Sequence, residues 1–89
     1  MEAKDFKKIV KEAKKVGGTI IIKTFPNEEH TLSTTTATNI KVTDTMLSFD
    51  VEYVLCYGSA NNSICTVYIP LDKICSASII WKKTKSKKD

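Results

Sequence analysis

The sequence predicts a mostly β domain of the α+β class, in which an N-terminal helix packs on a small, strongly bent barrel of five strands. Two observations lead to this prediction. Apolar residues recur with helical spacing in residues 3–16, and after Gly17-Gly18 the pattern changes to short β-branched segments separated by turn residues. At 89 residues, the chain is expected to form one compact domain over residues 1–81, followed by a disordered, lysine-rich tail at 82–89.

The predicted helix has one apolar side and one basic side. Its apolar positions follow the i, i+3, i+4 rule and are Ala3, Phe6, Ile9, Val10, Ala13 and Val16. Six lysines fill most of the other positions, namely Lys4, Lys7, Lys8, Lys11, Lys14 and Lys15. Gly17-Gly18 predicts the end of the helix, because glycine adopts the left-handed conformation at little cost.

Five strands are expected after the helix. Their predicted ranges are 19–25, the threonine-rich 30–42, 46–57, 64–69 and 74–81. In 46–57, Leu47 and Phe49 alternate with Ser48 and Asp50, which is the period of a strand with one apolar face. Pro70 predicts a tight corner before the last strand, because proline cannot donate to a ladder. Five strands of this kind indicate a partly open Sm-like barrel or, alternatively, an OB-like one.

The formal charge of +4 is unevenly distributed along the chain. Residues 1–16 hold six lysines against three acids, and residues 82–89 hold five lysines against one, whereas the middle is acidic. The chain lacks arginine, and lysine alone favours nonspecific, salt-sensitive contact with polyanions. The lysines also suit a purely solubilising role. The candidate polyanion contacts are Lys4, Lys7, Lys8, Lys11, Lys14, Lys15, Trp81, Lys82, Lys83, Lys85, Lys87 and Lys88.

The three cysteines predict buried, reduced thiols rather than a metal site. Cys56, Cys65 and Cys75 show no C-x-x-C spacing, and with His30 they form no usual zinc set. A disulfide between Cys56 and Cys65 across a hairpin remains an alternative. No apolar leader and no membrane-length apolar run are present, so the sequence predicts a cytoplasmic protein with no membrane partner.

No constellation of catalytic residues is recognisable, so we expect a protein that is not an enzyme and needs no cofactor. His30 stands beside Glu28 and Glu29 and is predicted to be a solvated turn histidine. Among the aromatic residues, Phe49, Tyr53 and Tyr57 are expected in the core. Tyr68 and Trp81 are the better candidates for exposure.

The segment Thr66–Ile79, TVYIPLDKICSASI, resembles the family of stringent starvation protein B, an adaptor that hands tagged substrates to an AAA+ protease. The resemblance lies in an apolar strand, a proline, a short turn and the next strand. It implies an N-terminal helix on an Sm-like bent barrel with a groove or open edge for a partner. Residues 82–89 depart from that family, since they hold lysines where those adaptors carry a short apolar docking peptide.

The first functional hypothesis is a protein-interaction module, either an adaptor or a regulator or inhibitor of a host protein. Its predicted binding surface is an exposed strand edge formed by Thr31, Ser33, Thr34, Thr35, Thr36 and Thr38. Because open edges also drive self-association, a homodimer is a corollary. The alternative hypothesis is nucleic-acid binding by the lysine-rich helix and tail.

Overall fold

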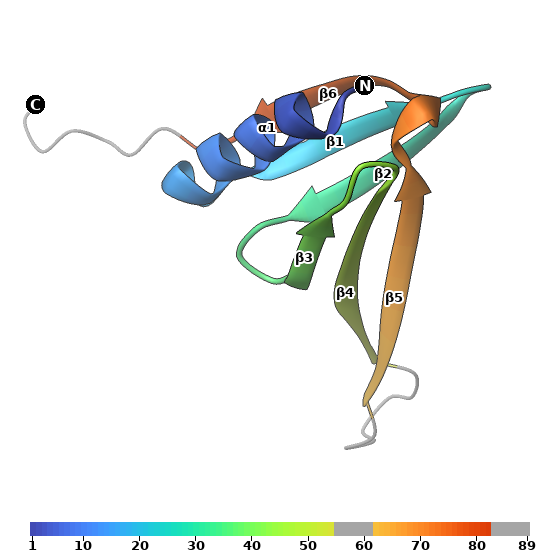
Figure 1. Ribbon diagram of the computed structural model, residues 1–89. Helices are drawn as coiled ribbons and strands as arrows, with labels where there is room; N and C mark the ends of the chain where they lie inside the picture. Colours follow the sequence, from blue (N-terminus) through green and yellow to red (C-terminus); the bar gives the residue numbers. More distant parts are fainter. Residues whose placement is uncertain (55–61, 83–89) are drawn as a thin grey trace, which may run out of the picture.

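The computed structural model describes residues 1–54 and 62–82, in which one helix is followed by six strands (Figure 1). The strands form two three-stranded antiparallel sheets, with the orders β2-β1-β6 and β3-β4-β5. In chain order the elements are α1 (Ala3–Val16), β1 (Thr19–Thr24), β2 (Glu28–Ser33), β3 (Thr38–Val42), β4 (Met46–Val54), β5 (Asn62–Pro70), the 3-10 turn η1 (Leu71–Lys73) and β6 (Ile74–Ile80). The expectation of a mostly β fold with an N-terminal helix is confirmed.

Helix α1 forms where the apolar spacing predicts it and ends where the glycines predict. Phe6, Val10 and Ala13 are buried, and the lysines face outward. Gly17 adopts a left-handed φ of 61°, and the Gly18 N–H donates to the Ala13 carbonyl at 2.8 Å. No helix in the described part of the chain has the length and apolarity needed to cross a membrane.

The threonine-rich segment differs from the prediction of a single strand over residues 30–42. It divides into β2 and β3, which belong to different sheets and are joined by a turn over residues 34–37. The Thr34 hydroxyl and N–H both donate to the Gly18 carbonyl, at 2.7 and 3.1 Å, and the Ala37 N–H donates to Ser33. These bonds tie the turn to the end of α1 and break the strand. The result is six strands, and the described ladders do not close into a barrel.

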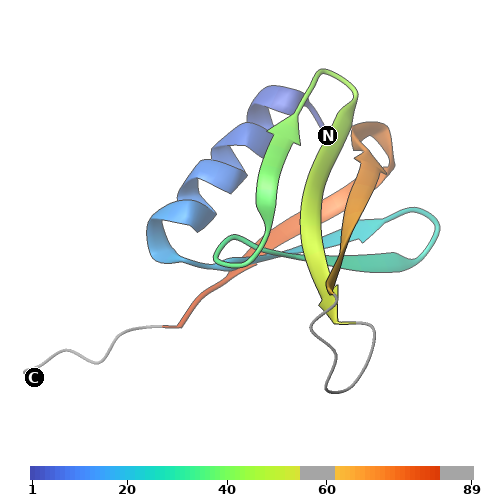
Figure 2. The ribbon, with the colours of Figure 1, turned by 90° about the horizontal axis from the view of Figure 1, so that it is seen from below.

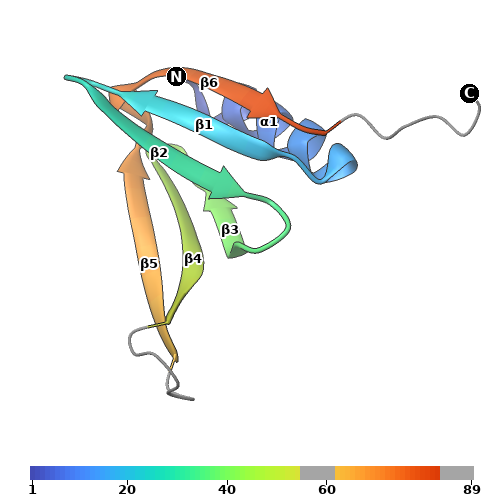
Figure 3. The same ribbon diagram turned by 180° about the vertical axis from the view of Figure 1, so that it is seen from behind.

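A short corner carries the chain from one sheet to the other. Strand β5 ends at Pro70, η1 turns the chain, and β6 pairs with β1 in the first sheet (Figures 2 and 3). The Leu71 N–H donates to the Thr45 carbonyl at 2.9 Å, and the Phe25 N–H donates to the Lys73 carbonyl at 2.8 Å. The predicted strand, proline corner and final strand are therefore confirmed.

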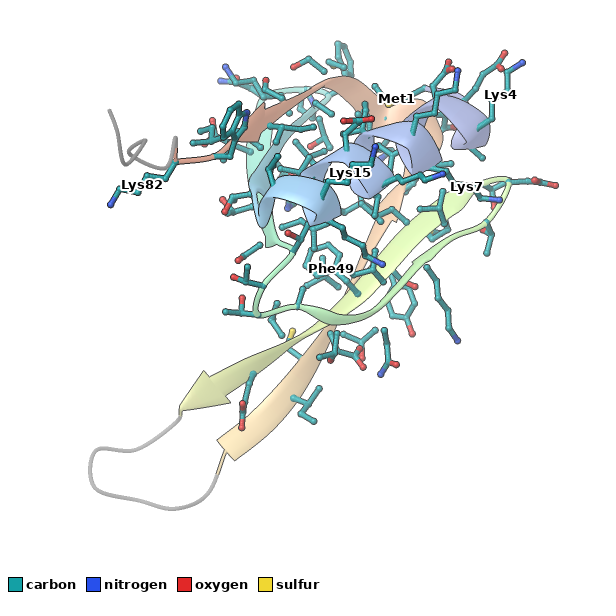
Figure 4. The ribbon with its side chains drawn as sticks, turned by 90° about the vertical axis from the view of Figure 1, so that its left-hand side faces the viewer. Met1, Lys4, Lys7, Lys15, Phe49 and Lys82 are labelled. Carbon is teal, nitrogen blue, oxygen red and sulfur yellow. The ribbon has the colours of Figure 1, made fainter. Side chains whose placement is uncertain are left out.

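The core lies where α1 and the two sheets meet. Phe6 and Phe49 are its largest members, and Figure 4 shows Phe49 between α1 and the strands. Burying a large apolar side chain stabilises a fold by about 1.5–3 kcal/mol. The buried apolar residues come from every layer and are Phe6, Val10, Ala13, Ile20, Ile22, Leu32, Ala37, Leu47, Phe49, Ile69, Leu71 and Ile74.

Candidate functional site

The residues predicted to form one open strand edge are not together on one strand. Thr31 and Ser33 lie on β2, and Thr38 begins β3. Thr34, Thr35 and Thr36 lie in the turn between these strands. The main-chain N–H of Thr34 is already used on Gly18, and that of Thr36 donates to Ser33 at 3.3 Å. A continuous strand edge over 31–38 is therefore not formed, because the turn divides it and uses the N–H groups of Thr34 and Thr36, and only Thr31 and Ser33 remain on the outer strand β2.

A better edge for a partner strand lies on β5, which pairs with β4 alone among the described strands. In an antiparallel ladder, residues whose main-chain groups bond to the neighbouring strand alternate with residues whose groups point away from it. The hydrogen bond from the Leu71 N–H to the Thr45 carbonyl shows which residues bond to β4, and the pairing of β5 with β4 continues from there without a register shift. By that alternation, the main-chain groups of Ile64, Thr66 and Tyr68 point away from β4. Their side chains also share the outer face, where Ile64 is 70% exposed and Tyr68 is 66% exposed.

A hollow of about 280 Å³ lies at the Pro70 end of this edge, where the β1–β2 turn approaches β5. Tyr68 lines it together with Phe25, which is 69% exposed. The wall also contains Thr24, whose buried hydroxyl oxygen has no hydrogen-bond partner within the described residues. The remaining lining residues are Pro26, Glu28, His30, Ile69, Pro70 and Lys73.

His30 is not the solvated turn residue that the sequence predicts. It lies on β2, opposite Ile22 of β1, and its side chain is one-third exposed. Its Nε2 lies 3.7 Å from a carboxylate oxygen of Glu28. Because alternate residues of a strand share a face, the His30 side chain lies on the same face of β2 as the buried Leu32. His30 also lines the hollow.

On the outer face of the second sheet, three side chains join the three strands. Asn39, with φ of 53°, donates its amide N–H to one oxygen of Asp50 at 2.8 Å. The Thr66 hydroxyl donates to the other oxygen at 2.7 Å. These two hydrogen bonds, and to a lesser degree the charge of Lys41, lower the pKa of Asp50 below its ordinary value. The arrangement supports the register of β3, β4 and β5 and leaves Asp50 no catalytic partner among the described residues.

The lowered pKa of Asp50 predicts a contribution to stability that depends on pH. This contribution is complete above the ordinary unfolded-state pKa of about 4 and is lost as the pH falls through the folded-state pKa. Thr66→Val removes one donor and should raise the Asp50 pKa toward the ordinary value. NMR titration of the carboxyl carbon measures both pKa values. A wild-type pKa at or above the ordinary value would contradict the hydrogen bonds described here.

The basic residues line one side of α1. All six predicted lysines are exposed, and helical geometry places them within roughly one-third of its circumference. Glu12 lies outside this arc and approaches Lys15 with a distance of 3.9 Å between Oε2 and Nζ. Trp81 is 52% exposed and Lys82 is exposed, so the expected exposure of Tyr68 and Trp81 is confirmed. Lys83, Lys85, Lys87 and Lys88 lie outside the described residues.

The cysteines depart in part from the prediction of three buried residues. Cys65 is half-buried with a free thiol, but Cys75 is exposed, because it faces outward at the bulge where β6 shifts register against β1. Cys56 and its possible pairing with Cys65 lie outside the described residues. Over residues 1–54 and 62–82, no three His, Cys, Asp or Glu side chains are grouped to hold a metal ion.

Sequence reasoning identified Tyr68 as an exposed aromatic residue but did not place it on a free edge beside Phe25. The available signal was Phe25-Pro26, an aromatic residue in a turn, together with the proline that ends β5. Comparison with protein-family models, curated proteins and solved structures gave no match to this chain.

Proposed function

We propose that the protein is a non-enzymatic protein-interaction module, an adaptor or a regulator or inhibitor of a host protein, that pairs the free edge of β5 with an extended segment of its partner. The supporting observation is the coincidence of two features in the same three residues. Ile64, Thr66 and Tyr68 direct outward main-chain groups that have no strand partner among the described residues, and they also present the exposed side chains of the edge. Main-chain hydrogen bonds supply affinity in strand addition, and alternate side chains supply specificity.

The edge of β5 is favoured over that of β2 for a chemical reason. Strand β2 offers only polar exposed side chains, including Glu29 and Thr31, and ends in the turn fixed to Gly18. Strand β5 offers isoleucine and tyrosine, which bury apolar area against a partner. The hollow between Tyr68 and Phe25 accepts one partner side chain.

We also propose that the two sheets form an open Sm-like barrel. In this interpretation, β2 and β3 are the two halves of one interrupted strand, so that the barrel has five strands. Support comes from the single core shared by both sheets and from the turn of residues 34–37 that joins the halves. The segment resembling the protease adaptors, Thr66–Ile79, lies within β5–η1–β6, so Thr66 and Tyr68 of the proposed edge lie on the part of the chain that carries the resemblance.

A cytoplasmic location belongs to the same proposal. Its support is Cys75, which is an exposed free thiol. Exposed thiols persist in a reducing compartment and are uncommon in secreted proteins.

Thr66→Pro tests the proposal with Thr66→Val as its matched control. Both variants lose the hydroxyl bond to Asp50, but only proline also removes the outward main-chain N–H. Wild-type protein, each variant and bare resin are used to capture partners from nuclease-treated lysate, with circular dichroism confirming that both variants are folded. We expect a stoichiometric protein that is retained by wild type and Thr66→Val and lost by Thr66→Pro.

Hydrogen exchange then locates the contact. The amides of Ile64, Thr66 and Tyr68 should become protected when the captured protein is added. Equal capture by all three forms, or protection confined to β2, would contradict strand addition at β5. Protection that appears without a partner, and only at high protein concentration, would identify a second copy of the chain as the occupant.

A further inference from the structure

The structure places the end of α1 beside the end of β6, although 63 residues lie between Val16 and Ile80 in the chain. Thr19 pairs with Ile80, and a Cβ built on Gly18 would lie 3.3 Å from the Cβ of Trp81. Trp81 therefore emerges next to the end of α1, whose last turn carries Lys14 and Lys15. Figure 4 shows Lys4, Lys7 and Lys15 following α1 toward the end of β6, where Lys82 lies. An exposed indole thus stands at one end of a row of lysines.

The packing of α1 restricts what this row can bind. Phe6, Val10 and Ala13 are buried in the core, so the helix has no free apolar face to insert into a lipid surface. The lysines are exposed, and the acids of the middle region lie on other elements. A polyanion in water is therefore the matching ligand class. The chain lacks arginine, and lysine ammonium groups act as point charges on phosphates, so we expect a contact that depends little on sequence.

We propose that this surface binds single-stranded nucleic acid, with an unpaired base stacked on Trp81 and the adjoining phosphates held by Lys14, Lys15 and Lys82. Single strands are favoured over duplexes because an indole stacks on a base that is free of its partner, and aromatic stacking beside a basic groove is the recurring means of nonspecific single-strand binding. The proposal does not depend on β5, which belongs to the other sheet.

The test uses the full-length protein and intrinsic fluorescence, since Trp81 is the chain's only tryptophan. The probe is an unlabelled oligothymidylate of about 15 nucleotides, within the site sizes typical of single-strand binders. We expect saturable quenching of Trp81 whose affinity falls with salt, and no comparable quenching by a duplex of the same length. A flat titration, or tighter binding of the duplex, would overturn the proposal.

Two sets of variants separate stacking from general charge, with affinity measured by the anisotropy of a labelled oligothymidylate. Trp81→Leu should weaken binding by about fivefold or more, whereas Trp81→Phe should retain most of the affinity. Lys14→Gln with Lys15→Gln should lower the slope of log K against log salt by about 1.4, at roughly 0.7 for each lost phosphate contact. The matched control, Lys23→Gln with Lys41→Gln, removes the same charge from the sheets and should leave that slope unchanged.

Circular dichroism verifies that each variant is folded. Because all variants keep residues 83–89, the lysines of that segment contribute equally to every measurement. Equal binding by wild type and Trp81→Leu would exclude the stacked base. Equal losses in the two lysine pairs would show that only net charge matters, and would also overturn the proposal.

Discussion

Replacing Phe6 with alanine is expected to lower the free energy of unfolding by about 3–5 kcal/mol, the largest loss from any single truncation considered. Phe6 is fully buried and belongs to the core that α1 shares with both sheets. Its truncation removes apolar burial and leaves a cavity where helix and strands meet. Since small domains are stable by only about 5–15 kcal/mol, this variant should lose a large share of its stability.

Urea unfolding followed by far-ultraviolet circular dichroism measures the effect of Phe6→Ala. Lys8→Ala, on the exposed side of the same helix, is the control and should change stability by no more than about 0.5 kcal/mol. If Phe6→Ala cost as little as Lys8→Ala, α1 would not be docked on the sheets as described.

Leu71→Ala is expected to cost about 2–5 kcal/mol, because Leu71 fills the core at the corner between the two sheets. Its side chain is 2% exposed, and its main-chain N–H bonds to Thr45. Truncation therefore leaves the hydrogen bond in place and removes only the packing. Since η1 follows β5 directly, the loss should also loosen the Pro70 side of the hollow beside Tyr68.

Leu71→Met provides the volume-conserving comparison and should cost less than about 1.5 kcal/mol. The same urea titrations measure both variants. Equal stabilities for Leu71→Ala and Leu71→Met would mean that packing at the corner does not hold the sheets together. Retention of the hydrogen bond to Thr45 is checked by exchange of the Leu71 amide.

The helix, the proline corner and the two strands that flank it could be predicted because their signals are local. The spacing of Phe6, Val10 and Ala13 requires only helical geometry, and the glycines after Val16 end any helix. Pro70 interrupts a ladder whatever its neighbours are. For such elements, local sequence preferences outweigh the effect of tertiary contacts.

The division of the threonine-rich segment and the location of the free edge depend on distant residues. Threonines favour extended structure, yet Thr34 turns the chain because the Gly18 carbonyl lies within reach of both its hydroxyl and its N–H. In β5, both faces are largely apolar in sequence, since Ile64 and Tyr68 alternate with Cys65, Val67 and Ile69. Only packing into the shared core decides which set is buried, and only the ladder with β4 decides which edge of β5 stays open.

The open edge of β5 also matters for how crowded copies of the chain behave. A strand whose outer edge has no partner among the described strands, and which displays isoleucine and tyrosine, is a template on which identical chains can stack into aggregates. The surplus of four positive charges opposes such stacking, but this repulsion reaches only about 10 Å at 0.1 M salt. The lysines that suit a polyanion therefore act as colloidal protection as well, and any ligand that neutralises them brings the chains closer to assembly.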